Sequence, residues 1–178
     1  AVNPFVNIGE MNNKGVDVGL NYNGTALSNQ LKFSIGTNFS TYRNNVVKTN
    51  GDPNTIYTGF GLRIPAVTAT RQGSPLSSFY GYTIDGIFQS DSEGAAHAKQ
   101  RNGIDNVAGR FKFRDVNSDG IINAADQGFI GSPHPDYTYG LNLNASFKNF
   151  TFTAFAQGVQ GNQLFNYVRY WTYFQTFQ

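Results

Sequence analysis

The chain has 178 residues, a mass of 19.6 kDa and a net charge of +2, which is the size of one ordinary domain. It contains no cysteine, which excludes disulfides, thiolate metal sites and a cysteine nucleophile. Its 13 Lys and Arg residues form no basic run and are nearly balanced by 11 Asp and Glu residues, so nucleic acid is not an expected partner.

Alternation of apolar and polar residues predicts an antiparallel hairpin near the start of the chain. In Val16–Asn23 the even positions are apolar and the odd ones polar. In Leu31–Tyr42 the odd positions are mostly apolar and the even ones polar, over about 12 residues. Gly24–Asn29 has the composition of the turn between them.

The middle of the chain is less regular. Arg43–Pro75 has the composition of a loop, and its length makes it a candidate functional segment. Two further strands are expected at Ser77–Gln89 and Gly109–Asp115. The one expected helix is short and lies between them at Asp91–Gln100, with Ser92 as its N-cap.

A second hairpin is predicted near the end of the chain. Tyr137–Lys148 alternates as Leu31–Tyr42 does, and Phe150–Gln160 is its partner strand. Lys148 and Asn149 form the turn, in which Asn149 is expected to take a positive φ. An aromatic cluster follows, which could form protein core, a membrane-interface belt or a sugar-stacking surface: Tyr167, Tyr170, Trp171, Tyr173 and Phe174.

The sharpest local motif lies at residues 115–126 and matches the spacing of a calcium-binding loop. Oxygen-bearing side chains occupy positions 1, 3, 5 and 12, glycine occupies position 6, and a backbone carbonyl is available at position 7. The expected ligands are Asp115, Asn117, Asp119, the carbonyl of Ile121, and Asp126. Asp126 replaces the usual bidentate Glu, and no strong helix precedes the loop, so it is similar to a dockerin-type loop. These residue types also build ordinary turns, but the number of matching positions favours calcium.

No catalytic motif accompanies these elements. The sequence has no nucleophile elbow, phosphate-binding loop or dinucleotide fingerprint. The two histidines, His97 and His134, are expected to be surface residues. The chain is therefore not expected to be an enzyme.

Amphipathic strands of this length fit two architectures. In a soluble sandwich the apolar face packs on a second sheet, whereas in an outer-membrane barrel it faces lipid and the polar face lines the lumen. Short turns at Gly24–Asn29 and Lys148–Asn149 and a long loop at Arg43–Pro75 fit the barrel. The two sides agree if the residues from Ser77 to Asp115 contribute two crossings or none. The two candidate strands there make six in all. Six strands are too few to close a membrane barrel, so this chain would be one segment of a larger wall.

Several phrases, in order along the chain, resemble one family. They are Asn7–Val16, Ser77–Tyr82 with Asp85–Gln89, Phe111–Gly120, Ile130–Asp136 and Phe155–Asn162. Together they look like the later part of the β-barrel of SusC/RagA-type TonB-linked outer-membrane transporters, the TonB-dependent receptors of Bacteroidota. The plug, the TonB box, the first barrel strands and the terminal strand are expected to lie outside these 178 residues.

The resemblance implies a large plugged barrel in the bacterial outer membrane, surrounded by lipid. Such a barrel would import oligosaccharides or peptides, would be driven by TonB through parts of the parent chain absent here, and would be capped by a SusD-like surface lipoprotein. Transport requires no catalytic residues, and substrate contacts are not carried over. The alternative is a secreted soluble β-sheet module that binds calcium alone or calcium and carbohydrate.

Overall fold

The computed structural model describes residues 9–49, 51–58 and 66–173. They divide into two compact units, and each is described by itself. The first unit comprises Ala1–Asn54, Gln72–Leu76 and Ser132–Gln178, and the second comprises Thr55–Arg71 and Ser77–Gly131.

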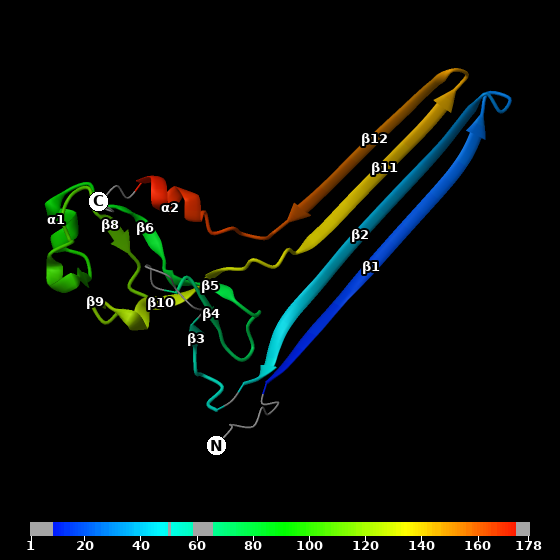
Figure 1. Ribbon diagram of the computed structural model, residues 1–178. Coiled ribbons are helices and arrows are strands. Elements are labelled where there is room, and N and C mark those ends of the chain that lie inside the picture. Colours follow the sequence, from blue (N-terminus) through cyan, green and yellow to red (C-terminus); the bar gives the residue numbers. More distant parts are fainter. Residues whose placement is uncertain (1–8, 50, 59–65, 174–178) are drawn as a thin grey trace. The chain divides into compact units, whose positions relative to one another are not determined.

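A sheet of four long antiparallel strands dominates the first unit (Figure 1). The strands are β1 (Glu10–Ala26), β2 (Leu31–Lys48), β11 (Tyr137–Phe147) and β12 (Phe150–Gln160). Their order in the sheet is β1-β2-β11-β12, so each predicted hairpin forms and the two hairpins pair with each other through β2 and β11. The sheet is not closed, because β1 and β12 have no second neighbour among the described residues.

Two expectations about strand extent were wrong. β1 and β2 have 17 and 18 residues, so β1 begins well before Val16 and β2 continues to Lys48. The expected loop Arg43–Pro75 therefore begins as strand. Because β2 pairs directly with β11, no described strand from the intervening residues enters the long sheet. Among the described residues the number of crossings there is zero, one of the two values that the turn pattern allowed, and the count of six wall strands is wrong.

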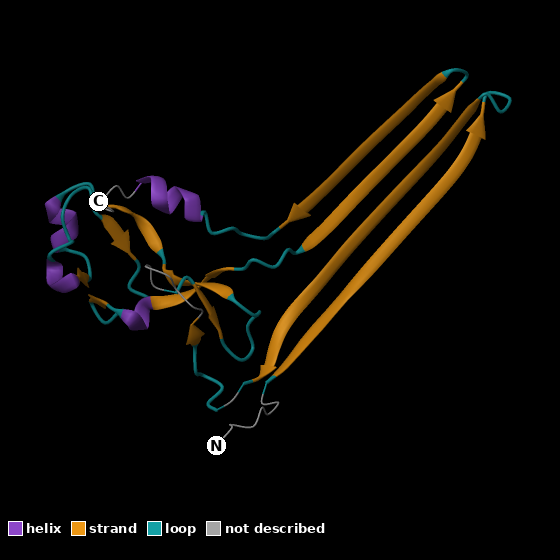
Figure 2. Ribbon diagram, in the orientation of Figure 1, coloured by secondary structure: helices purple, strands orange, loops and turns teal. Residues whose placement is uncertain are grey.

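Both tight turns lie at the same end of the sheet, as Figure 2 shows. In the first turn Leu27, Ser28 and Asn29 all have positive φ. In the second turn Lys148 has φ +51°, whereas Asn149 does not have the positive φ expected for it. The long connection from β2 to β11 leaves from the opposite end.

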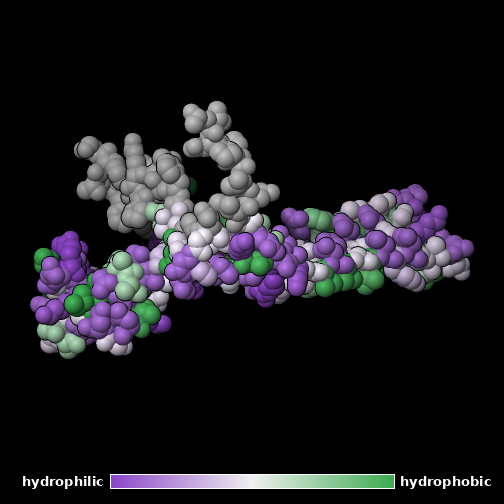
Figure 3. Space-filling view, turned by 90° about the horizontal axis from the view of Figure 1, so that it is seen from below, coloured by the Kyte–Doolittle hydropathy of each residue, from purple (hydrophilic) through white to green (hydrophobic). Residues whose placement is uncertain are grey.

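The strand register separates the side chains onto two faces. We call one the apolar face; it carries Val16, Val18, Leu20, Tyr22, Phe33, Ile35, Phe39, Tyr139, Leu141, Leu143, Phe150 and Phe152. The opposite, polar face carries Asp17, Asn21, Asn23, Lys32, Ser34, Asn38, Asn142, Asn144 and Thr153, and it also includes Phe155 and Val159. Purple and white atoms cover much of the sheet in Figure 3, with green atoms along its margin. Leu20 and Tyr22 remain 63% and 62% exposed, so no described residue covers the apolar face as the second layer of a sandwich would.

Glycines in the long sheet stand directly opposite large side chains on the neighbouring strand. Gly15 pairs with Tyr42, Gly24 with Phe33, Gly36 with Asn21, Gly140 with Asn38, and Gly158 with Tyr139. In the last four pairs the larger side chain lies in the space that a Cβ on the glycine would need, whereas at Gly15 the backbone oxygen of Thr41 is the nearest atom. The glycines therefore act as cross-strand partners of these side chains, which explains their frequency in otherwise regular strands.

Small sheets and turns make up the second unit. Its strands are β3 (Tyr57–Thr58), β4 (Thr68–Thr70), β5 (Ser78–Tyr82), β6 (Ile84–Ile87), β7 (Lys99–Gln100), β8 (Phe111–Phe113), β9 (Ile121–Ile122) and β10 (Gln127–Gly131). They form one four-stranded sheet, β10-β5-β4-β3, and two pairs, β6-β8 and β7-β9. Helix α1 (Asp91–Ala95) and the 3₁₀ turns η1 (Arg101–Gly103) and η2 (Ala124–Asp126) connect them.

These elements correct the predictions for the middle of the chain. Ser77–Gln89 is divided between β5 and β6, which belong to different sheets. Gly109–Asp115 contributes only the three residues of β8. Helix α1 ends at Ala95, and its N-cap is Ser90 rather than Ser92, because the Ser90 hydroxyl accepts the Glu93 N–H.

A second helix, α2 (Tyr167–Tyr173), was not predicted; it covers most of the aromatic cluster, while Phe174 lies outside the described residues. Among the described residues, no helix has both the length and the apolar character needed to cross a membrane.

Candidate functional site

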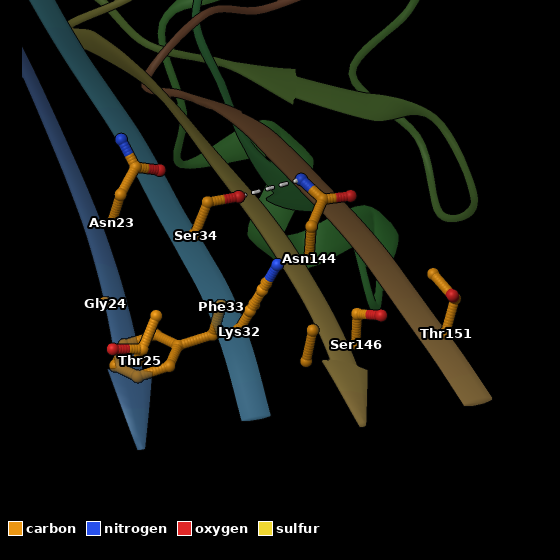
Figure 4. A pocket seen from close by; sticks show the side chains of 10 residues that line it. Asn23, Gly24, Thr25, Lys32, Phe33, Ser34, Asn144, Ser146 and Thr151 are labelled. Carbon is orange, nitrogen blue, oxygen red and sulfur yellow. Dashed lines mark hydrogen bonds between the residues drawn. The ribbon is translucent and has the colours of Figure 1, made fainter. Parts of the chain in front are cut away.

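A ladder of polar side chains crosses the polar face near the tight turns (Figure 4). Ser34 of β2 lies between Asn23 of β1 and Asn144 of β11, and Asn144 pairs with Thr153 of β12. The Asn144 amide donates to the Ser34 hydroxyl at 3.3 Å, and the Thr153 hydroxyl donates to the Asn144 carbonyl oxygen at 3.1 Å. Strand alternation thus aligns hydrogen-bonding groups across the sheet.

The ladder borders an open hollow, whose lining also includes Gly24, Phe33 and Ala145 of the apolar face (Figure 4). Thr25, Lys32, Ser146 and Thr151 line it on the side nearest the turns. Their hydroxyls and the Lys32 ammonium can bind amides, hydroxyls or carboxylates, but the lining has no acid–base pair for catalysis. Such a surface suits binding or lining of an aqueous passage.

The calcium-like loop lies in the second unit, and its first five positions fold together. Asp115 accepts the N–H groups of Asp119 and Gly120, at 3.3 and 2.8 Å. The Asn117 oxygen also accepts the Asp119 N–H, and the Asn117 amide donates to the Asp119 carboxylate at 2.8 Å. Gly120 has φ +82°, the sharp turn that position 6 of such a loop requires. Each carboxylate oxygen keeps a further lone pair, so the donor chemistry is suitable for a hard cation.

Asp126, at position 12, has a different environment. Its side chain is buried, and its two oxygens accept the N–H groups of Val116 and Asn123 at 2.9 and 2.8 Å. The Asn123 N–H lowers the pKa of this carboxyl, burial opposes the shift, and the Val116 N–H contributes in the same direction as Asn123. Within the described part of the chain, no three His, Cys, Asp or Glu side chains converge as a metal site. Calcium binding by Asp115, Asn117, Asp119, Ile121 and Asp126 stays a prediction.

His134 was expected to be a surface residue, and the structure shows that its ring contacts two other segments of the first unit. Its Nε2 lies 2.9 Å from the Leu76 carbonyl oxygen, and its ring meets Tyr42 edge-on. Leu76 ends the segment Gln72–Leu76, which pairs with β2 through Val46 N–H to Ser74 oxygen, at 3.0 Å. Gln72–Leu76 therefore hydrogen-bonds to the part of β2 that continues past the first residues of β11. No local pattern predicts it, because the pairing is between distant residues.

Electrostatic pairs also hold the second unit. Arg114 binds both oxygens of Asp85, with a shortest distance of 2.5 Å, and this pairing lowers the pKa of Asp85. Lys112 binds Glu93 at 2.7 Å and lowers the pKa of Glu93. These charged groups therefore stabilise the unit rather than form an acid–base site.

Comparison with known proteins identifies the class. No protein-family model matches the sequence. TonB-dependent receptor P3 of Formosa agariphila is 35% identical over 166 residues, which cover 90% of this chain and 16% of that receptor. TonB-dependent receptor P26 of the same organism is 29% identical over 160 residues, again covering 90% and 16%. The chain thus spans about one sixth of the length of these relatives.

Solved structures agree on the fold. A structure of the RagAB peptide transporter matches 87% of this chain with a TM-score of 0.61 and 22% identity, covering 16% of the solved chain. A structure of the RagAB peptide importer in a closed-closed state matches 88% with the same TM-score and 23% identity. The prediction of an all-β, antiparallel segment of a transporter barrel is confirmed, with an open rather than closed sheet.

The chain is therefore a segment of a TonB-dependent receptor. The proteins that it matches are receptors and transporters of the bacterial outer membrane rather than enzymes.

Proposed function

We propose that this chain forms part of the wall of a SusC-like transporter that imports substrate across the outer membrane. The observation that carries the proposal is the long sheet, whose apolar face is exposed and whose polar face carries the hydrogen-bonding ladder. An apolar face toward lipid and a polar face toward the lumen is the arrangement that a barrel wall requires. Because short turns are periplasmic in such barrels, Leu27–Gln30 and Lys148–Asn149 face the periplasm, and the opposite end of the sheet, where the long connection from β2 to β11 leaves, faces the exterior.

Oligosaccharides or peptides are the proposed substrates. The polar face offers amides and hydroxyls, which hydrogen-bond equally to sugar hydroxyls and to peptide groups. The likeness to the RagAB peptide transporter favours peptides, whereas the resemblance to SusC favours glycans. The proposed partners are a SusD-like lipoprotein on the exterior and TonB through other parts of the parent chain.

Calcium is proposed as a structural ion of the second unit. The spacing of Asp115, Asn117 and Asp119 and the positive φ of Gly120 support it. Bound calcium would supply a cationic centre that stiffens this loop at the exterior.

The test measures the location, size and transport activity of the parent polypeptide in its own cells. Membranes are fractionated and blotted with an antibody against Arg43–Pro75, and uptake of labelled oligosaccharides and peptides is compared with a strain lacking the gene. A band of about 100 kDa in the outer membrane, the rough size of a plugged barrel, together with lost uptake of one substrate class, supports the proposal. A soluble band of about 20 kDa, near the 19.6 kDa of this chain, would instead indicate the secreted calcium-binding module.

A further inference from the structure

The apolar face ends in aromatic rings at the end of the sheet away from the turns. Phe39 and Tyr137 stack with ring centroids 5.6 Å apart, and Tyr139 lies 6.4 Å from Tyr137. Aromatic girdles mark the hydrocarbon boundary in membrane barrels. These rings therefore indicate where the apolar band ends on this side.

Two cations stand just beyond the rings on the same face. Lys14 of β1 and Arg43 of β2 are direct cross-strand partners, and both side chains are exposed. On β2, Arg43 lies four residues beyond Phe39 and is the second side chain past it on this face. Like charges that face each other directly are unfavourable unless an anion lies between or beside them. We call Lys14 and Arg43 the rim pair.

One carboxylate partly compensates the rim pair. Asp136 binds Arg43 at 2.6 Å and is itself held by the Thr41 hydroxyl, which donates to the Asp136 carbonyl oxygen at 2.7 Å. Lys14 makes no ion pair with any residue that the structure describes. The three groups carry one net positive charge, and the side chain of Arg43 remains 76% exposed, which leaves guanidinium N–H donors for a second anion.

The position of the rim pair matches a bilayer surface. Leu31, at the turn end of the apolar face, precedes Arg43 by twelve residues along β2. At about 3.3 Å per residue and a strand tilt of about 40°, these twelve steps rise about 30 Å along the membrane normal. The apolar band of a barrel is about 25 Å tall, so the rim pair lies just outside it, at the depth of lipid headgroups. At the other end Leu31, Phe147 and Phe150 are uncharged, and the cation beside them is the single Lys148 of the turn, whose Nζ lies 5.2 Å from the Phe147 ring centroid.

We propose that Lys14 and Arg43 bind a phosphate of the phosphorylated glycolipid in the outer leaflet, the lipid A class. The inference rests on the proposed function, because that function sets the direction of the sheet and turns this end outward. Charge complementarity carries it: two cations at paired cross-strand positions of a lipid-facing surface lie at the depth where that leaflet presents phosphates. Arg43 would supply paired N–H donors and Lys14 a point charge, with Asp136 keeping the guanidinium oriented.

The test uses the full-length receptor in nanodiscs of phosphatidylcholine. Diphosphorylated lipid A, enzymatically dephosphorylated lipid A or phosphatidylglycerol is added at a fixed fraction, and retained lipid is counted by native mass spectrometry. Wild-type receptor should retain diphosphorylated lipid A about tenfold better than the dephosphorylated form, and Lys14→Gln/Arg43→Gln should abolish that preference. Arg43→Lys should keep most of it, and Lys32→Gln, a cation lost from the polar face, should keep all of it.

An unchanged preference in the double variant overturns the proposal, and so does retention of phosphatidylglycerol equal to that of lipid A. Cell fractionation and heat-modifiable electrophoretic mobility of the same variants distinguish failure of the lipid site from failure of the proposed function. A receptor that assembles in the outer membrane but shows no phosphate preference overturns only the lipid site, whereas a soluble protein overturns the proposed function itself.

Discussion

The side chain of Asn106 forms a hydrogen-bonded bridge to the backbone of Gln100, with its oxygen 2.8 Å from the Gln100 nitrogen. The Asn106 amide also donates to the carbonyl oxygens of Gly94 and Ala98, each at 2.9 Å. Gln100 in turn bonds the backbone of β8, through Phe111 oxygen and Phe113 nitrogen. Two buried amides thus join helix α1, β7 and β8 in a unit that has few buried apolar side chains.

Replacing Asn106 with alanine should open this part of the second unit. The change leaves the Gln100 N–H without its partner and removes one of the donors to the Gly94 and Ala98 carbonyls, which is expected to cost about 1–3 kcal/mol of local stability. Hydrogen exchange of the full-length receptor should show faster exchange at Gln100 and around Gly94–Ala98. Gln89→Ala, which removes an exposed amide bonded only to Ile87 oxygen, is the control and should exchange as wild type. Equal exchange in both variants would contradict the bridging role.

A lysine at Leu20 should block barrel assembly, whereas a lysine at Asn21 should not. Leu20 lies opposite Thr37, midway along the apolar face, and Asn21 points to the polar face. A lysine near the bilayer midplane is expected to cost about 2–4 kcal/mol. The outer-membrane content of each variant, measured by immunoblot, should fall for Leu20→Lys alone. Because Leu20 is 63% exposed, a water-soluble module would tolerate both changes alike, and equal amounts would contradict the membrane wall.

Calcium binding should depend on the first half of the loop. Equilibrium dialysis of the full-length receptor should show one fewer bound calcium ion for Asp115→Ala and for Asp119→Ala than for wild type, because each loses a carboxylate ligand. Asp105→Ala is the control, since that carboxylate lies outside the loop and pairs with Arg101. Undiminished stoichiometry in both loop variants would remove the site.

Acidification should loosen the loop through Asp126. Its pKa is lowered in the folded protein, so its contribution to stability is complete above the ordinary aspartate range and is lost as the pH falls through that range and then through the lowered pKa. Hydrogen-exchange protection of Val116 and Asn123, corrected for the intrinsic pH dependence of exchange, should decline below about pH 5. In Asp126→Asn the protection should be lower at neutral pH and should no longer change with pH. A pH-dependent decline that persisted in Asp126→Asn would assign it to another group.

A glycine at Lys148 should stabilise the second hairpin. Lys148 has φ +51°, a conformation that glycine adopts without strain, and the replacement is expected to contribute about 0.5–1 kcal/mol. The effect would appear as a higher midpoint for thermal loss of heat-modifiable mobility. Asn149→Gly, at a position without positive φ, should lower that midpoint slightly; the opposite order would contradict the turn geometry.

Alternation in the sequence predicted the long strands because each of their faces meets one kind of environment. It failed at Arg43–Lys48, where Arg43, Asn44 and Asn45 have the composition of a loop although Asn44 pairs with Asn13 in the sheet. Asparagine is disfavoured in strands by local propensity, and cross-strand hydrogen bonding overrides that preference here.

The second unit was less predictable for a different reason. Gln100, Asn106 and Asp126 are polar in sequence, so no hydrophobic pattern marks them as interior, yet all three are buried. Their partners are backbone groups of other segments, and such pairings depend on the complete fold. The close approach of Asp115, Asn117 and Asp119 could be predicted from their spacing, because these residues interact within a single turn.

Because glycines face large side chains across the long sheet, substitutions on neighbouring strands are expected to be epistatic. A methyl group added at Gly140 would lie within 2.3 Å of the Asn38 oxygen, so Gly140 can change only if Asn38 moves or becomes smaller. The same holds for Gly36 with Asn21, where the separation would be 2.8 Å. A substitution at either glycine is therefore expected to depend on whether the facing amide rotates away or is itself replaced, and libraries that randomise one strand at a time would discard combinations that two strands together could accommodate.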